Sequence, residues 1–355
     1  MASFSSFAVK HRLQENSKLL KLDKLIDWSR FESLLRGIHK NDIDSKGGRR
    51  CYDKICMLKL VLLGQWNSLS DEELEYAVRV RLDFISFCGF DIEDKVPDHS
   101  TICRFRNKLI EIDLIDKILT EVNNQLSENH LKVAKANLAV IDATLIESNS
   151  RPNRTKTIEE HIIKDREEVT STDTNAGTES ESEFTMEESD SSDPDAKWLQ
   201  KGNKYHFGYK SFATTDEEGY ICKTKTLPAN KSEINQMSDM VIDSREFSGD
   251  KGYDSKSNRE FLRNRGIKTR LMYKKPKGKP MTKWQKRFNK AVSKRRFIVE
   301  QSFGTLKRRF KFNKASYFTT KKVNAQFTLK AICLNLLKAV NKIKAFIPPE
   351  KLELG

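Results

Sequence analysis

The sequence has few cysteines and no long apolar run. Its six cysteines are scattered over 355 residues and form no Cys-x-x-Cys pair, which argues against a zinc ribbon and a disulfide framework. No apolar stretch approaches the roughly 18 residues that a membrane span needs. The first residues also lack the apolar core and cleavage site of a signal peptide. These absences predict a soluble cytoplasmic protein in reducing surroundings, with no membrane partner.

Acidic residues are almost absent from one long segment near the carboxyl end. Residues 263–314 contain twenty Lys or Arg and a single acid, Glu300. Residues 165–195 show the reverse composition, with twelve acids and one base. The whole chain carries 65 bases and 50 acids, a net charge of +15. The basic stripe predicts binding to the phosphate backbone of nucleic acid, and a solvated lysine-rich surface is the simpler alternative.

The length suggests roughly two domains, and the first part of the chain is predicted to be helical. An apolar run at 57–65 and a capping box of Ser70 and Glu73 predict two helices. A turn at 96–100 precedes a further helix, so residues 1–130 form a helical unit. This last helix is compatible with a helix-turn-helix module or with an ordinary helical bundle. Its exposed bases are Arg104, Arg106 and Lys108.

Residues 131–345 change to short apolar strands between helices, which is typical of a mixed α/β fold. Strands are predicted at 138–143, 205–213, 220–227 and 267–271, and residues 248–254 are predicted to form the end of a further strand and a glycine turn. Helices are predicted at 232–241, 257–265, 283–310 and 321–345. An acidic insertion at 158–195 interrupts this part. It has too few apolar residues to fold alone, so we predict it to be disordered.

Two aspartates are candidates for chemistry. Asp142 ends the apolar run at 138–143, where a carboxylate beside a core needs a partner or a metal. Asp250 precedes Lys-Gly-Tyr, and the glycine there permits close backbone approach or a positive φ. For both residues the alternative is an aspartate that only caps a turn.

Glu300 gives the sharpest signal, because it is the lone acid of the basic stripe. Its helix places Glu300, Arg296 and Lys307 on one polar face beside an apolar stripe. An ordinary ion pair between Arg296 and Glu300 at i,i+4 spacing is the alternative. The arrangement favours an acid that holds a divalent cation while the bases hold phosphates.

Asp142, Asp250 and Glu300 together form an all-oxygen ligand set. Mg²⁺ and Mn²⁺ take such ligands and keep waters for a substrate phosphate. Two such ions about 4 Å apart can activate a nucleophile and stabilise the leaving oxygen of a phosphodiester. No cluster of His and Cys competes for this role, and no Gly-x4-Gly-Lys-Ser/Thr loop suggests chemistry driven by ATP.

The motifs around these acids resemble those of bacterial insertion-sequence transposases of the DDE type, in the group called insertion-sequence family five. The Glu300 segment, RRFIVEQSFGTLKRRF, matches most of the family signature Tyr-x2-Arg-x3-Glu-x6-Lys, with Arg296, Glu300 and Lys307 correctly spaced. Ser293 stands at the Tyr position of that signature. The resemblance covers residues 58–337, through the segments 96–109, 139–148, 202–212, 249–255 and 295–310.

The resemblance implies a helical N-terminal DNA-binding domain over residues 1–130 and an RNase H-like catalytic domain over residues 131–345. That catalytic domain has a mixed five-stranded sheet flanked by helices. Asp142 lies on its first strand, Asp250 near its fourth and Glu300 on a late helix. In this family such acids are catalytic and hold two Mg²⁺ or Mn²⁺ ions, the aspartates bridging both ions and the glutamate completing the shell of the second.

The resemblance also implies the reaction and its partners. An activated water cuts a DNA strand at each element end, and the released 3′-OH attacks target DNA. The partner is double-stranded DNA, bound by a homodimer in the bacterial nucleoid. Arg296 and Lys307 are expected to hold phosphates near the scissile bond, and Arg104, Arg106 and Lys108 to contact terminal inverted repeats.

Lys210, on the predicted central hairpin, is a further candidate for DNA contact, and a solvent-facing lysine is its alternative. Two other functions stay open at this point. One is an RNase H-like nuclease or resolvase, and the other is a non-catalytic DNA-binding repressor derived from a transposase.

Overall fold

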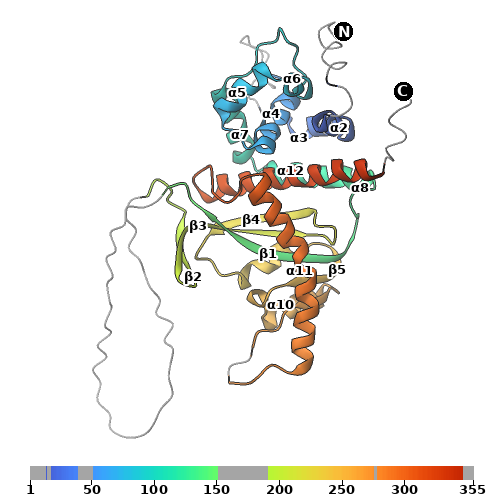
Figure 1. The fold of residues 1–355 in the computed structure, drawn as a ribbon, viewed down its shortest axis with the longest axis vertical. Helices are drawn as coiled ribbons and strands as arrows, with labels where there is room; N and C mark the ends of the chain where they lie inside the picture. The colour runs from blue at the N-terminus through green and yellow to red at the C-terminus, as the bar shows by residue number, and fades with distance from the viewer. Residues whose placement is uncertain (1–12, 14–16, 39–50, 151–190, 276–277, 347–355) are drawn as a thin grey trace.

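The computed structural model describes residues 13, 17–38, 51–150, 191–275 and 278–346 (Figure 1). The predicted acidic insertion at 158–195 lies outside these residues, except for its last five. Among the helices that the structure describes, none combines the length and apolarity needed to cross a bilayer.

The first part of the chain is helical, as predicted. Ser70 caps its helix in a reciprocal capping box with Glu73, and the Asp98 side chain accepts a hydrogen bond from Thr101 N at the start of the arginine-bearing helix. The helices are α2 (Lys18–Leu25), α3 (Arg30–Leu34), α4 (Lys54–Asn67), α5 (Asp71–Val80), α6 (Leu82–Cys88), α7 (His99–Glu111) and α8 (Ile115–Glu128).

A mixed sheet forms the centre of the second part. Its strands are β1 (Ala136–Glu147), β2 (Lys197–Lys201), β3 (Lys204–Thr215), β4 (Ile221–Pro228), β5 (Ser244–Gly249) and β6 (Lys268–Leu271). β3 pairs antiparallel with β1, β2 and β4, whereas β5 lies parallel to β1 and to β6. The spatial order is therefore β4-β3-β1-β5-β6, with β2 beside the first half of β3.

The sheet has six strands, not the predicted five. The additional strand is β2, whose sequence Lys-Trp-Leu-Gln-Lys is short and charged at both ends. It becomes a strand only because it forms a hairpin with the start of β3. Such pairing is a tertiary effect that a five-residue pattern does not reveal.

Helices α10 (Lys256–Asn264), α11 (Lys283–Arg309) and α12 (Thr320–Phe346) agree with the predicted ranges. The predicted helix at 232–241 is shorter than expected. There the chain forms one 3₁₀ turn, η2 (Ile234–Gln236), followed by a single helical turn, α9 (Met237–Met240). A second 3₁₀ turn, η3 (Lys251–Tyr253), follows β5.

Two apolar clusters cover the two faces of the sheet. One contains Val140 of β1 with Phe303 of α11 and Phe327 of α12, and it continues into the N-terminal helices. The other contains Ile141 of β1 and Phe247 of β5 beneath α9 and α10. Because adjacent strand residues point to opposite faces, Val140 and Ile141 enter different clusters.

Helix α12 lies between the N-terminal helices and the sheet (Figure 1), and it packs against both α4 and β4. Its middle is buried on all sides, which suits a helix whose residues are apolar around most of the circumference. The helical unit and the sheet therefore share one continuous core.

Candidate active site

Strand pairing brings Asp142 and Asp250 side by side. The last parallel pair between β1 and β5 joins Val140 to Ser248. Each aspartate lies two residues beyond its member of that pair, so both point to the same face. That face is the one covered by α11, because Val140 and the apolar stripe of α11 belong to the same cluster.

Asp142 lies within β1 rather than at its end, which corrects the sequence prediction. β1 continues to Glu147 because its second half pairs with β3 as far as Glu147 opposite Gly208. Pairing between β1 and β5 therefore stops just before Asp142, whereas β1 itself continues beyond it. Its carboxylate is 15% exposed and accepts a hydrogen bond from Ala143 N at 2.9 Å.

Helix α11 supplies the remaining groups of the site. Val299, Phe303 and Leu306 bury the apolar stripe of α11 against the sheet. Arg296 and Glu300 follow at i,i+4 spacing on an adjoining face. As a result, both side chains reach the point where the two aspartates lie.

All three predicted acids bind one guanidinium. Arg296 Nη2 donates to Asp142 Oδ2 at 2.8 Å and lies 3.5 Å from Glu300 Oε1. Arg296 Nη1 lies 3.5 Å from Asp250 Oδ1. The structure thus brings together carboxylates that are 108 and 50 residues apart in the chain. We name Asp142, Asp250 and Glu300 the carboxylate cluster.

The electrostatics of the cluster follow from unequal burial. The Asp142 carboxyl has a raised pKa, because burial disfavours its charge more than Arg296 favours it. For Arg296, burial lowers the pKa, but the carboxylates together raise it by more, so that the net shift is upward. Glu300, with 57% of its side chain exposed, forms the open side of the cluster.

The cluster has the donor chemistry of a hard divalent cation, since it offers only carboxylate oxygens. Within the residues that the structure describes, no three His, Cys, Asp or Glu side chains have the spacing of a metal site. In the carboxylate cluster the shared cation is the guanidinium of Arg296. Asp142, Asp250 and Glu300 therefore have the donor chemistry of a metal site and converge on one cation, but in this structure they are spaced around a guanidinium and not around a metal ion.

The other predicted contact residues differ in accessibility. Lys307 is half-buried, and its Nζ donates to Leu145 O at 3.2 Å; burial is the main cause of its lowered pKa. Arg104 is exposed at the surface of α7. Lys108 pairs with Glu111 at 2.9 Å.

Three of the predicted DNA contacts need correction. Arg296, expected to hold a phosphate, is 13% exposed and its guanidinium faces the three carboxylates. Arg106 is 5% exposed, forms a bidentate ion pair with Asp71, and lies over the ring of Tyr317. Lys210 is 9% exposed and lies 3.3 Å from Glu233. The side chains of Arg106 and Lys210 are both held inside the fold by acids, so neither is available at the surface.

Comparison with known proteins identifies the family. Residues 7–108 match the family described as Transposase domain (DUF772), and residues 134–336 match the Transposase DDE domain. Over 245 residues the chain is 38% identical to "Transposase for insertion sequence element IS1106" of Neisseria meningitidis serogroup B. That alignment covers 68% of this chain and 78% of the relative. The chain belongs to the DDE transposases of insertion sequences.

As a DDE transposase, the protein is an enzyme that cleaves and transfers DNA strands, and it depends on divalent metal as its family does. DNA is its partner. These findings confirm the predicted family and function.

Two solved structures are also similar to this DDE transposase. The piggyBac transposase synaptic complex with hairpin DNA matches at a TM-score of 0.44 with 11% identity, over 93% of this chain and 76% of that one. The Mos1 mariner paired end complex with Mn matches at a TM-score of 0.20 with 10% identity, over 90% and 87%.

Glu233 and Tyr253 of this transposase were not predicted as site residues from the sequence, yet both take part in the electrostatics of the site. A Cβ added to Gly252 would lie 2.7 Å from Glu233 Oε2, so the glycine after Lys251 allows close approach and not a positive φ. The Tyr253 hydroxyl is buried and has no hydrogen-bond partner in the described part of the chain. Its pKa is raised far above the ordinary value, first by burial and then by Glu233 and Asp142. The only signal in the sequence was the Gly-Tyr pair of GDKGYDS.

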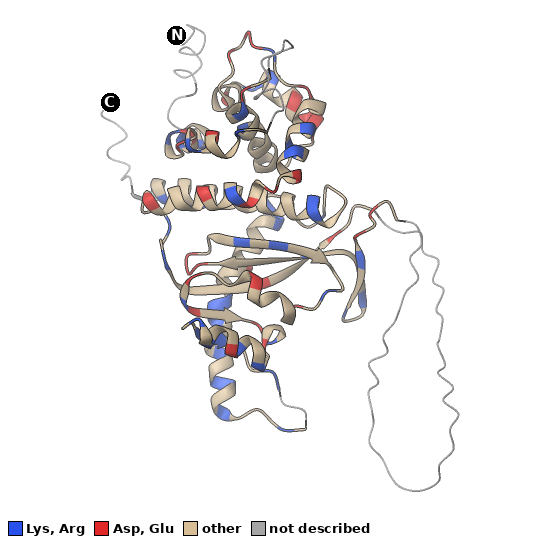
Figure 2. Cartoon of the chain, turned by 180° about the vertical axis from the view of Figure 1, so that it is seen from behind, with Lys and Arg blue, Asp and Glu red and all other residues tan. Residues whose placement is uncertain are grey.

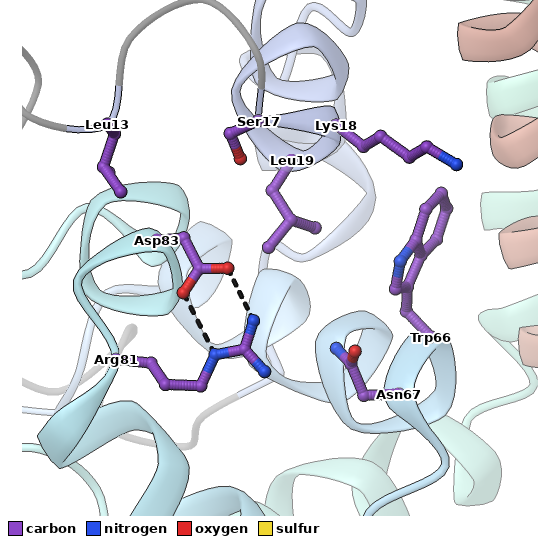
Figure 3. A pocket seen from close by; sticks show the side chains of 8 residues that line it. All are labelled: Leu13, Ser17, Lys18, Leu19, Trp66, Asn67, Arg81 and Asp83. Carbon is purple, nitrogen blue, oxygen red and sulfur yellow. Dashed lines mark hydrogen bonds and ion pairs between the residues drawn. The ribbon is translucent and has the colours of Figure 1, made fainter.

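A surface pocket of about 360 Å³ lies elsewhere in the transposase (Figure 3). It is lined by residues of α2, the end of α4 and the start of α6, including Trp66, Arg81 and Asp83. Arg81 and Asp83 pair with each other across 2.7 Å. None of the carboxylate cluster lines this pocket.

Proposed function

We propose that the carboxylate cluster is the catalytic centre of an RNase H-like domain, and that it holds two Mg²⁺ or Mn²⁺ ions. The convergence of Asp142, Asp250 and Glu300 on one guanidinium supports this proposal. The sheet order β4-β3-β1-β5-β6, with two parallel and two antiparallel junctions, supports the RNase H-like assignment.

Bound divalent ions would activate the attacking oxygen and stabilise the leaving oxygen of the phosphodiester. Asp142 supplies the rigid side of the site, because its strand pairs with β3 at this residue and with β5 up to Val140, and its carboxylate is 15% exposed. Glu300 supplies the accessible side, with 57% of its side chain exposed. DNA therefore approaches from the side of α11.

We assign DNA contacts to the basic face of α11. Lys286, Arg287, Lys290 and Lys294 lie along its first half, and Figure 2 shows Lys and Arg in succession along this helix. Lys307 lies on the far side of Glu300 and holds a phosphate near the scissile bond. Charged contacts of this type position the backbone without reading sequence.

The remaining assignments follow from the family. Residues 1–130 form the DNA-binding domain and residues 131–345 the catalytic domain, with the insertion 158–195 inside it. Arg104 and Lys108 on α7 contact the terminal inverted repeats. Two copies act together on DNA in the bacterial cytoplasm, because two element ends must be handled at once.

Removal of a single carboxylate of the cluster tests the catalytic assignment. Asp142→Asn and Glu300→Gln should each lower the rate of DNA cleavage at least about 100-fold. Mutation of residues that only hydrogen-bond to metal ligands already costs about 10–100-fold in metal affinity or activity. The measurement is nicking of a labelled element end with Mg²⁺ or Mn²⁺. Asp243→Asn, which removes an exposed carboxylate that pairs with Lys135, is the matched control and should cleave as the wild type does.

A strand-transfer assay with a pre-cut 3′-OH end separates the alternatives. We expect the 3′-OH end to be joined to target DNA, and we expect this joining to require all three carboxylates. Nicking without joining would instead indicate a nuclease. DNA processing that Glu300→Gln leaves unchanged would contradict the catalytic assignment.

A further inference from the structure

The environment of Arg296 is unusual for an arginine on a nucleic-acid-binding helix. Its guanidinium is 13% exposed, while neighbouring bases of α11 project from the surface. Its Nη1 and Nη2 face the three carboxylates. Its Nε is buried and donates to no partner among the residues that the structure describes. Arg296 is therefore engaged with the cluster rather than presented to DNA.

Three carboxylates at one point repel one another, and a cation must offset that repulsion. Among the described residues, the ion pairs of Asp142, Asp250 and Glu300 are all with Arg296. Arginine keeps its proton under all ordinary conditions, so it cannot be neutralised in place. A divalent ion bound to the same oxygens would lie a few ångströms from this fixed positive charge and would be repelled by it.

We propose that Arg296 is a built-in counter-cation that holds the carboxylate cluster together in the absence of metal and competes with divalent ions for it. This inference rests on the proposed metal-binding role of the cluster. When a divalent ion binds, the guanidinium of Arg296 would leave the carboxylates by rotation of its own side chain, because Val299 and Phe303 anchor α11 in the core. The displaced guanidinium then becomes available to a phosphate, for which its planar fork is well suited.

The competition is measured by Mn²⁺ binding to the full-length protein, using calorimetry or electron paramagnetic resonance. Arg296→Gln should bind Mn²⁺ about tenfold more tightly than the wild type, or more, because the competing charge is gone. Arg295→Gln is the matched control. It removes the same charge one residue earlier, where the side chain pairs with Glu246 at 3.0 Å, and should leave Mn²⁺ affinity within about twofold.

The thermal unfolding midpoint gives a second readout. Without metal, Arg296→Gln should unfold at a lower temperature than the wild type, because the carboxylates repel one another. Added Mn²⁺ should then raise its midpoint by more than that of the wild type. Equal or weaker Mn²⁺ binding by Arg296→Gln, with wild-type binding intact, would overturn the inference.

The wild-type protein provides a test that needs no stable variant. In an NMR titration of arginine-labelled protein, the Arg296 Nε–H signal should move as Mg²⁺ saturates the site, whereas the Arg295 signal stays in place. An Arg296 signal that does not move at saturation contradicts displacement. Mn²⁺ binding that Asp142→Asn fails to weaken would instead refute the metal site itself, and so the two failures are distinguishable.

Discussion

Lys330 of α12 is a charged side chain inside the shared core. It is 3% exposed, and its Nζ donates to Phe310 O at 2.7 Å. Burial lowers its pKa from 10.5 to about 8, since no carboxylate of the described residues compensates for the lost hydration. Lys330 contrasts with Arg106 and Lys210, which are also buried but paired with acids.

This shift predicts a pH-dependent stability. Between pH 8 and 10.5 the unfolded chain holds a proton that folded Lys330 has released, so stability rises with pH across that window. Lys330→Met keeps the apolar stem and removes the titration. Relative to this variant, the wild type should gain roughly 2 to 3 kcal/mol between pH 7 and pH 10, as measured by urea unfolding. A constant difference between the two proteins would contradict the prediction.

Asn335 joins three elements at the edge of the sheet. It lies fully buried on α12, where its Oδ1 accepts from Ile221 N at 2.9 Å. Its Nδ2 donates to Ile221 O and to Asn123 Oδ1 of α8, both at 2.8 Å. The side chain thereby pairs with the backbone N–H and C=O of Ile221 at the edge of β4, as the backbone of a further strand would.

Loss of this amide should therefore destabilise the contact between helices and sheet. Asn335→Ala leaves the buried N–H of Ile221 without its partner and should cost at least about 2 kcal/mol of unfolding free energy. Chemical denaturation measures this cost. Asn341→Ala changes an exposed asparagine of the same helix and should cost under about 0.5 kcal/mol. Equal losses for the two variants would refute the bridging role.

The charge of the whole molecule is unevenly distributed, and α11 joins its basic surface to the carboxylate cluster. Binding of Lys and Arg to phosphates releases counterions, so DNA affinity should fall steeply with salt. Replacement of Lys286, Arg287, Lys290 and Lys294 by Ala should weaken binding to any DNA sequence. The slope of log affinity against log salt should become shallower by about 0.9 for every phosphate that is no longer neutralised.

The control for this prediction carries substitutions at exposed lysines of other helices. Lys117→Ala with Lys322→Ala changes α8 and α12 and should alter the salt slope by much less per charge. Fluorescence anisotropy at several salt concentrations compares the proteins. An equal effect per charge in the control would show that net charge, and not the α11 surface, determines affinity.

Local pattern was sufficient to predict most of the elements and to single out three acids that meet in the fold. The capping box of Ser70 and the apolar stripe around Glu300 depend on residues three to seven apart, so they are visible in the chain itself. Asp142, Asp250 and Glu300 were identifiable because a carboxylate beside a core or within a basic stripe is exceptional. The short strand β2 and the shortening of the helix at 232–241 could not be predicted from the sequence, because tertiary pairing overrides weak local preference.

The sequence by itself thus determined the family, most of the helical and strand-forming segments, and three acids that the fold brings together. Only the tertiary structure decided which charged side chains meet. Arg296, Arg106 and Lys210 look alike as exposed bases in a linear pattern, yet Arg106 and Lys210 lie buried and Arg296 half-buried, each against an acid distant in sequence. The reason is physical: burial and ion pairing depend on how elements pack in space, and periodicity within one element carries no information about the partner element.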